Sequence, residues 1–265
     1  MKNLLIVSQK LQRNEQFYEY MLGKGIEVKW TEKLSQEPSF DTLVATDIPE
    51  VYAEYTNVVV IINNMEEADW FSNAEYLLLD IYDAEAEYFE RVWQRFKNIP
   101  WVISETERLI IRETIEDDVD RFYELYKNPL MTEYTEKLYE DINEEKRYVS
   151  EYRKKVYSVQ GFGIWTVILK ETGEIIGRAG LITRGGHDGV EVGFAIGVEY
   201  WHKGYATEAV KECVSLAKLL SFDEAYALTM HENTAAIKLL SGLGFGKELT
   251  ERLNGAEYEC WKINL

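Results

Sequence analysis

The chain has 265 residues, 46% of them hydrophobic and 13% aromatic, which is enough apolar material for more than one buried core. Its formal net charge of −18 disfavours nucleic acid, whose phosphates are bound by clustered lysine and arginine, and favours cationic or amine partners. Two cysteines, three separated histidines and only short apolar runs exclude a disulfide framework, a zinc-ligand spacing and a membrane span or signal peptide, so we expect a cytoplasmic protein without a metal or a membrane partner.

The first hundred residues alternate between short apolar runs and longer amphipathic ones. The short runs predict buried strands and the longer ones predict helices. The predicted strands are Leu4–Ser8, Ile26–Trp30, Thr42–Thr46, Val58–Ile62 and Tyr76–Leu79, and the predicted helices include Asn14–Leu22 and Ala84–Lys97. This order predicts a small parallel α/β, Rossmann-like domain over residues 1–100, which closes at Pro100 because proline disfavours helix at the residue before it.

Polar side chains follow several of these predicted strands: Ser8, Asp47, Asn63, Asn64 and Asp80. Ligands of parallel sheets gather at the carboxyl ends of strands, but the same residue types are common in turns and caps. Residues 43–49 resemble the late strand of haloacid-dehalogenase-like phosphatases, although the D-x-D nucleophile of that family is missing from the first strand. We therefore expect an accessory domain rather than a second active site.

Residues 101–265 follow with almost no linker and predict a second domain. Two runs, 164–170 and 174–183, predict a hairpin, and residues 184–189 predict the next turn. From Val190 to Val198 bulky residues alternate with small ones, which is typical of a half-buried strand. The only large side chain on the small-residue face is that of Glu191.

A helix start follows this strand directly. The segment His202–Thr207 precedes an amphipathic pattern that runs to Leu220, and its small residues Gly204 and Ala206 let backbone N–H groups approach a ligand closely. Successive amides at a helix N-terminus bind phosphate, so the segment predicts a diphosphate site. Further along the chain, the pattern predicts a strand over 224–230, a helix after Asn233 and two closing strands around Asn254-Gly255.

Three ordered segments of this second part resemble one known family. Residues 190–209, VEVGFAIGVEYWHKGYATEA, resemble motif A of the GNAT superfamily of acetyl-CoA-dependent N-acetyltransferases, with Gly204 and Ala206 in its two small positions. Trp201 replaces the first polar residue, as in the branch that includes the ribosomal-protein alanine N-acetyltransferases. Residues 105–113 resemble the opening strand of that branch, and residues 233–245 resemble motif B. The resemblance implies a GNAT fold, a mixed sheet with flanking helices whose fourth and fifth strands splay apart.

The resemblance also implies acetyl-CoA as cosubstrate and a set of contacts for it. Pantetheine is expected against the main chain of Ile196 and Val198 and against Asn233. Lys238, one turn beyond Asn233, is expected either to reach a CoA phosphate or simply to face water. The residues expected to hold the diphosphate are Lys203, Gly204, Tyr205, Ala206 and Thr207.

The chemistry requires a base that removes a proton from the attacking amine. Glu191 is our candidate for that base; the alternative is a carboxylate bonded to neighbouring backbone or to a basic side chain. Leu240 stands at the position where motif B usually has a tyrosine that acts as the general acid. The proton source for the leaving thiolate is therefore open between Tyr258, Tyr205, solvent and the incoming ammonium.

The predicted function is acetyl transfer to a primary amine, either on a protein N-terminus or on a small molecule such as a polyamine. The alternative is a non-catalytic acyl-CoA-binding sensor, which the presence of Glu191 opposes and the absence of the motif B tyrosine supports. Acidic residues between Glu133 and Glu151 either face water or attract a cationic substrate. The oligomeric state does not follow from these patterns.

Overall fold

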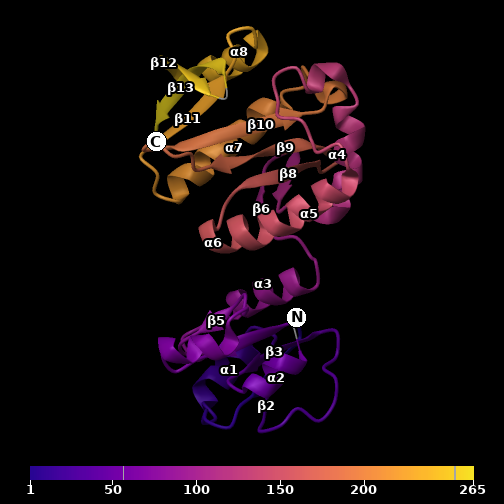
Figure 1. Cartoon of the computed structure of the whole chain (residues 1–265), viewed down its shortest axis with the longest axis vertical. Helices are drawn as coiled ribbons and strands as arrows, with labels where there is room; N and C mark the ends of the chain where they lie inside the picture. The colour runs from indigo at the N-terminus through magenta and orange to yellow at the C-terminus, as the bar shows by residue number, and fades with distance from the viewer. Residues whose placement is uncertain (56, 254) are drawn as a thin grey trace. The chain divides into compact units, whose positions relative to one another are not determined.

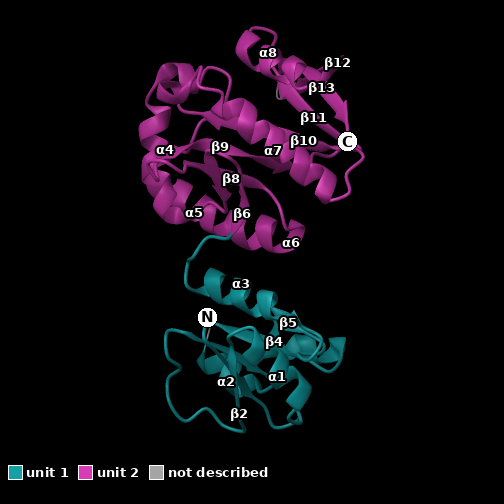
Figure 2. Ribbon diagram, turned by 180° about the vertical axis from the view of Figure 1, so that it is seen from behind, with its two compact units in different colours: residues 1–101 teal, residues 102–265 magenta. Residues whose placement is uncertain are grey.

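The computed structural model describes residues 1–55, 57–253 and 255–265, so the asparagine of the predicted Asn254-Gly255 turn lies outside the described residues. The chain divides into two compact units, residues 1–101 and residues 102–265 (Figures 1 and 2). Both units mix helices with a central sheet, which confirms the predicted α/β class. Among the described residues, no helix combines the length and the apolar character that crossing a membrane requires.

The first unit contains a five-stranded sheet in which every neighbouring pair is parallel. The strand order is β2-β1-β3-β4-β5, so the chain reverses its winding direction between β1 and β3. The strands are β1 (Asn3–Val7), β2 (Glu27–Thr31), β3 (Thr42–Thr46), β4 (Val58–Ile61) and β5 (Leu77–Leu78). This is the parallel sheet that the alternating apolar runs predicted.

Helices cover both faces of this sheet. Helices α1 (Glu15–Gly23) and α3 (Ala86–Phe96) pack on the face that carries Leu4 and Ile6. The short helix α2 (Pro49–Glu54) and the 3₁₀ helix η1 (Met65–Phe71) share a second cluster on the opposite face. Strand side chains alternate between faces, which is why β1 contributes to both clusters. The two short helices were not predicted, because six or seven residues are too few to display a helical period.

The second unit contains an eight-stranded sheet in the order β12-β13-β11-β10-β9-β8-β7-β6. All neighbouring pairs are antiparallel except β10 and β11, which run parallel. The strands are β6 (Val102–Glu105), β7 (Leu109–Arg112), β8 (Ile164–Leu169), β9 (Ile175–Ile182), β10 (Val190–Ile196), β11 (Glu224–Thr229), β12 (Gly246–Leu253) and β13 (Ala256–Asn264).

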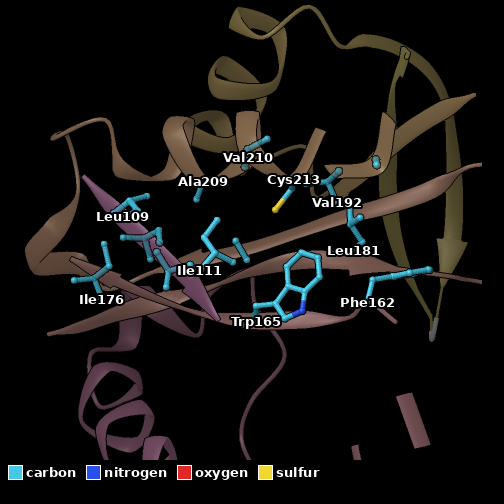
Figure 3. Close-up of a cluster of buried hydrophobic side chains, with 14 of the residues drawn as sticks. Leu109, Ile111, Phe162, Trp165, Ile176, Leu181, Val192, Ala209, Val210 and Cys213 are labelled. Carbon is cyan, nitrogen blue, oxygen red and sulfur yellow. The ribbon is translucent and has the colours of Figure 1, made fainter. Parts of the chain in front are cut away.

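The helices of this unit lie on both sides of the sheet. The remaining elements are η2 (Glu116–Asp118), α4 (Val119–Tyr126), η3 (Pro129–Met131), α5 (Ile142–Tyr152), the π-helical turn η4 (Arg153–Tyr157), α6 (Ser158–Gln160), η5 (Val198–Tyr200), α7 (Tyr205–Leu219) and α8 (Thr234–Gly242). Helix α7 buries Ala209, Val210 and Cys213 against strand residues that include Leu181 and Val192 (Figure 3). Because Val192 faces α7, its neighbour Glu191 faces the opposite side of the sheet.

Candidate active site

Strands β10 and β11 separate after only two paired residues. Val190 pairs with Ala225 and Glu191 pairs with Tyr226, and the remaining five residues of β10 have no partner on β11. The gap opens towards Ile196, at the end of β10 that leads into the loop before α7. The predicted splay between the fourth and fifth strands of the resembling family is therefore present, and Glu191 lies at its closed end.

Main-chain groups of β10 face this gap. The N–H of Gly197 donates to Ile176 O on β9 at 2.8 Å. By the alternation of an antiparallel ladder, the N–H and C=O groups of Ile196 and Phe194 then point away from β9. The Ile196 carbonyl accepts a hydrogen bond from the Trp201 indole at 2.6 Å and, with two lone pairs, retains a second acceptor direction. An extended ligand can pair with such an edge as an added strand does.

Val198 does not extend this edge, contrary to the prediction that it continues the strand. β10 ends at Ile196, and Val198 begins the 3₁₀ helix η5, where its carbonyl accepts from Trp201 N–H at 3.1 Å. Gly197 lies between the two elements, and a Cβ at this position would lie 2.7 Å from Leu125 of α4. The alternation of bulky and small residues therefore continues through Gly197 and Val198, two residues beyond the end of the strand.

The N-terminus of α7 offers uncapped backbone donors. Gly204 is its N-cap residue and has φ +82°, a left-handed conformation that glycine adopts without strain. No side chain caps the helix, and its first intrahelical bond runs from Glu208 N–H to Gly204 O at 3.0 Å. The N–H groups of Tyr205, Ala206 and Thr207 precede that bond and belong to the first-turn donors that a helix leaves unsatisfied. Such donors, together with the helix dipole, bind phosphate groups.

Arg108 is a cationic residue at this helix end that the sequence did not single out. Its Nη1 donates to Lys203 O at 2.9 Å, its Nε donates to Glu208 at 2.7 Å, and its guanidinium lies 4.6 Å from the Tyr205 ring centroid. Burial raises the pKa of Glu208, but hydrogen bonds from Thr106 and Arg108 outweigh it and lower the pKa overall. Arg108 is therefore braced beside the predicted diphosphate site while remaining partly exposed.

The two residues predicted from motif B lie on α8. Asn233 is the N-cap of that helix, and its side-chain oxygen accepts from Ala236 N–H at 3.1 Å, which leaves its amide N–H₂ as the group available to a ligand. Lys238 is exposed on the same helix. Leu240, at the position of the usual tyrosine, is completely buried.

Glu191 is only 7% exposed and is bound by a basic side chain. Arg184, from the turn before β10, donates through Nε to Oε2 at 2.8 Å and through Nη2 to Oε1 at 3.5 Å. This hydrogen bonding to Glu191 raises the pKa of Arg184. The Glu191 carboxylate is therefore bound by a basic side chain, which was the predicted alternative to its acting as a base. The weaker contact leaves Oε1 as the less engaged oxygen.

A third tyrosine, Tyr226, joins the possible proton sources. Tyr226 lies beside Glu191 in the parallel register, and its hydroxyl is buried without a hydrogen-bond partner among the described residues. Burial, and then the charge of Glu191, raise the pKa of this phenol, so it is a neutral donor. By contrast, Tyr205 packs under Arg108, and Tyr258 pairs with Glu251 at the far edge of the sheet. Tyr226 had no sequence signal because its position is that of any buried strand residue.

The polar side chains at the strand ends of the first unit make hydrogen bonds within that unit. Ser8 Oγ donates to Asp47 Oδ2 at 2.7 Å, between the ends of β1 and β3. Asn64 caps η1, Asp80 accepts from the backbone N–H two residues later, and Asn63 donates to a glutamate four residues later. The contacts of Asn63, Asn64 and Asp80 are the turn and cap roles that such residues commonly have. The Ser8–Asp47 bond instead joins two strand ends, and Asp47 Oδ1 is buried without a hydrogen-bond partner among the described residues.

The family model for the acetyltransferase (GNAT) domain matches residues 108–246, slightly more than half of the chain. The chain belongs to the GNAT acetyltransferase family. It is 30% identical over 146 residues to the uncharacterized N-acetyltransferase p20 of Bacillus licheniformis, covering 54% of this chain and 82% of that protein. It is 28% identical over 168 residues to the uncharacterized N-acetyltransferase YoaA of Bacillus subtilis, covering 59% of this chain and 92% of that protein.

Solved structures share the fold at lower identity. The ribosomal-protein-S5-alanine acetyltransferase from Vibrio fischeri superposes with a TM-score of 0.52 and 20% identity, over 61% of this chain and 95% of that one. With the family established, the chain is an acetyl-CoA-dependent acyltransferase, and the uncapped amides of α7 and the free edge of β10 fit its cosubstrate.

Proposed function

We propose that this enzyme transfers the acetyl group of acetyl-CoA to a primary amine, on a protein N-terminus or on a small molecule. The observation that carries the proposal is the position of Glu191, the only acidic side chain of β10, at the closed end of the splay. The fold shared with a ribosomal-protein alanine acetyltransferase supports an amine acceptor. The bound cosubstrate supplies the acetyl thioester.

In the proposed arrangement the cosubstrate lies across two parts of the site. Gly204, Tyr205, Ala206 and Thr207 hold the diphosphate through backbone N–H groups, and Lys203 and Arg108 add positive charge. The free edge of β10 at Ile196 pairs with the pantetheine arm, with the Asn233 amide as a further donor and Lys238 towards a phosphate. This division requires no metal and no cysteine nucleophile.

Glu191 removes a proton from the acceptor ammonium in this proposal. The Arg184 contact at 2.8 Å fixes the carboxylate through Oε2, so the less engaged Oε1 accepts the proton, directly or through water. The amine nitrogen then bonds to the acyl carbon as the carbon–sulfur bond breaks; the nitrogen loses its second proton to give the neutral amide, and the thiolate takes up a proton, so the step balances. A neutral Tyr226 hydroxyl beside Glu191 is one donor for that last step.

Acidic residues of the α4–α5 segment support a cationic acceptor. Hydrogen bonding to Glu191 is the main cause of the raised pKa of Arg184, and the charge of Glu136 adds a smaller effect of the same sign. A hydrogen bond with Glu133 and, to a smaller extent, the charge of Glu232 raise the pKa of Tyr134. The negative charge of these carboxylates favours a cationic acceptor such as an ammonium.

A panel of acceptors tests this function. Full-length protein is incubated with acetyl-CoA and with polyamines, aminoglycosides, or peptides that begin with alanine or serine, and CoA thiol release is measured. Release that depends on one amine class, with an acetylated product of matching mass, is expected. Acetyl-CoA binding without turnover of any amine would contradict the proposal and favour the sensor alternative.

We also propose that residues 1–100 form an accessory domain joined at Pro100. The cosubstrate candidates all belong to the unit that begins at Val102. In the first unit, turn and cap hydrogen bonds account for Asn63, Asn64 and Asp80.

A further inference from the structure

Three potential metal ligands converge on the face of the sheet that carries Glu191. One ligand atom each from His187, Glu251 and Cys260 lies within 4.8 Å of the other two. They come from the turn before β10, from β12 and from β13, so 64 and 73 residues of sequence separate the histidine from the other two. The expectation of no metal rested on linear spacing, which does not reveal such a cluster.

The hydrogen bonding and burial of these three side chains leave one carboxylate oxygen unsatisfied within the part of the chain that the structure describes. His187 Nε2 lies 3.3 Å from Glu251 Oε2, while Glu251 Oε1 is buried and has no hydrogen-bond partner among the described residues. Cys260 is 2% exposed, and burial, followed by the charge of Glu251, raises the pKa of its thiol to about 11. A buried carboxylate oxygen without a partner is costly unless an ion or a donor reaches it.

The ligand types and charges suit zinc. Imidazole nitrogen, carboxylate oxygen and thiolate sulfur are its usual donors, and tetrahedral ligand atoms lie about 3.5 Å apart. The His187–Glu251 contact already meets that spacing, and Cys260 would need to approach by roughly 1 Å. A thiolate and a carboxylate together neutralise a divalent ion. Binding would release the thiol proton, and the fourth position would be left to water.

A neighbouring side chain fixes the histidine. The Tyr226 ring stacks on His187 with centroids 4.3 Å apart and an interplanar angle of 19°. Tyr226 belongs to β11, which lies between β13 and β10 in the sheet. Groups that orient a metal-binding imidazole are a regular part of metal sites. An ion here would join the turn before β10 to the β12–β13 hairpin, across the closed end of the splay.

We propose that His187, Glu251 and Cys260 form a zinc-binding site that joins the turn before β10 to strands β12 and β13. The ligands of this site are distinct from the residues proposed for acetyl-CoA binding and for the base, because neither Glu191 nor the α7 N-terminus contributes one; the two sites share only Tyr226, which stacks on His187. The other buried cysteine, Cys213, takes no part in this site, because it belongs to α7 and packs in the hydrophobic core.

Cobalt(II) substitution of the full-length protein tests the site. Metal-free protein is titrated with Co²⁺, and we expect one equivalent to give visible tetrahedral bands and a sulfur-to-cobalt charge-transfer band that Zn²⁺ abolishes. Cys260→Ser should remove the charge-transfer band, whereas Cys213→Ala should retain it. Zn²⁺ should also raise the melting temperature of the wild type but not of Cys260→Ser.

His187→Ala keeps the test decisive if Cys260→Ser fails to fold, because this side chain lies in a turn and can be truncated with little effect on the core. We expect it to weaken Co²⁺ binding at least tenfold. No sulfur band in the wild type would overturn the proposal, as would a band that persists in Cys260→Ser or unchanged affinity in His187→Ala. Retention of acetyl-CoA binding in metal-free protein keeps this outcome separate from the acetyl-transfer proposal.

Discussion

The Gly204→Val substitution should separate two roles of the α7 N-terminus, its contribution to acetyl-CoA binding and its contribution to folding stability. Gly204 has φ +82°, and a Cβ there would lie 3.4 Å from Arg108 Nη2, an ordinary contact. The backbone conformation therefore sets the folding cost, about 1–2 kcal/mol for a left-handed residue. Valine adds two methyl groups beside the uncapped amides, which should also block a diphosphate.

Gly161→Val is the matched control. Gly161 has φ +78° in the same unit, with nothing within 4 Å of its Cβ position, so it carries similar strain away from α7. Saturation at a hundred times the Kd stabilises a protein by about 2.7 kcal/mol, and a hundredfold loss of affinity leaves only about 0.4 kcal/mol of that effect. For a unit of this size, these free energies correspond to melting-temperature shifts of roughly 5–11 °C and roughly 1 °C.

Differential scanning fluorimetry with and without acetyl-CoA gives the comparison. Both variants should melt below the wild type, but only Gly161→Val should retain the full shift on adding acetyl-CoA. Calorimetry should show the same difference in Kd. A full acetyl-CoA shift in Gly204→Val would refute the assignment of the diphosphate site.

Three further outcomes are expected. Arg108→Ala should weaken acetyl-CoA binding about tenfold by calorimetry, because a charged hydrogen-bond donor is lost, whereas the exposed Arg147→Ala should leave it unchanged. Hydrogen bonds, the largest from Lys247, lower the pKa of Glu259 from 4.5 to about 2. Its contribution to stability is therefore present above pH 4.5 and lost as the pH falls towards 2, and Glu259→Gln should flatten that part of the urea-unfolding profile. A chain of residues 102–265 should bind acetyl-CoA within a few fold of the full-length affinity; a folded truncation that fails to bind would place part of the cosubstrate site in the first unit.

The periodicity of apolar residues predicted most of the helices and strands. The features that it did not predict depend on contacts between residues far apart in the sequence. The alternation around Glu191 identified β10 and its small-residue face, but the same alternation wrongly carried the strand to Val198. The chain instead enters η5 at Val198, and Gly197 has no room for a side chain because Leu125, 72 residues earlier, occupies that space. A pattern within one strand contains no information about such a distant contact.

The same limit applies to the site. Gly204 and Ala206 were recognisable because a helix N-terminus is a continuous stretch of sequence. Arg108 reaches that helix end from β7's N-terminal side, and Tyr226 reaches Glu191 through a strand register. A basic side chain was one alternative partner predicted for Glu191, but Arg184 was not identified, since a turn's sequence does not fix where its side chains point. Residues that come together only in the folded structure have no fixed spacing in the sequence by which they could be recognised.

The most direct test of acetyl transfer at Glu191 is the turnover number of Glu191→Gln with saturating acetyl-CoA and the best amine of the panel, with acetylated product measured by mass spectrometry. Glu259→Gln provides the control, because it also removes a buried, ion-paired carboxylate, but one that pairs with different residues, on β12 and in the loop after β11. We predict a fall of roughly 10²–10⁴ in Glu191→Gln, the usual contribution of a positioned base, with acetyl-CoA affinity preserved and Glu259→Gln near the wild type. Wild-type turnover in Glu191→Gln at neutral pH would contradict the account.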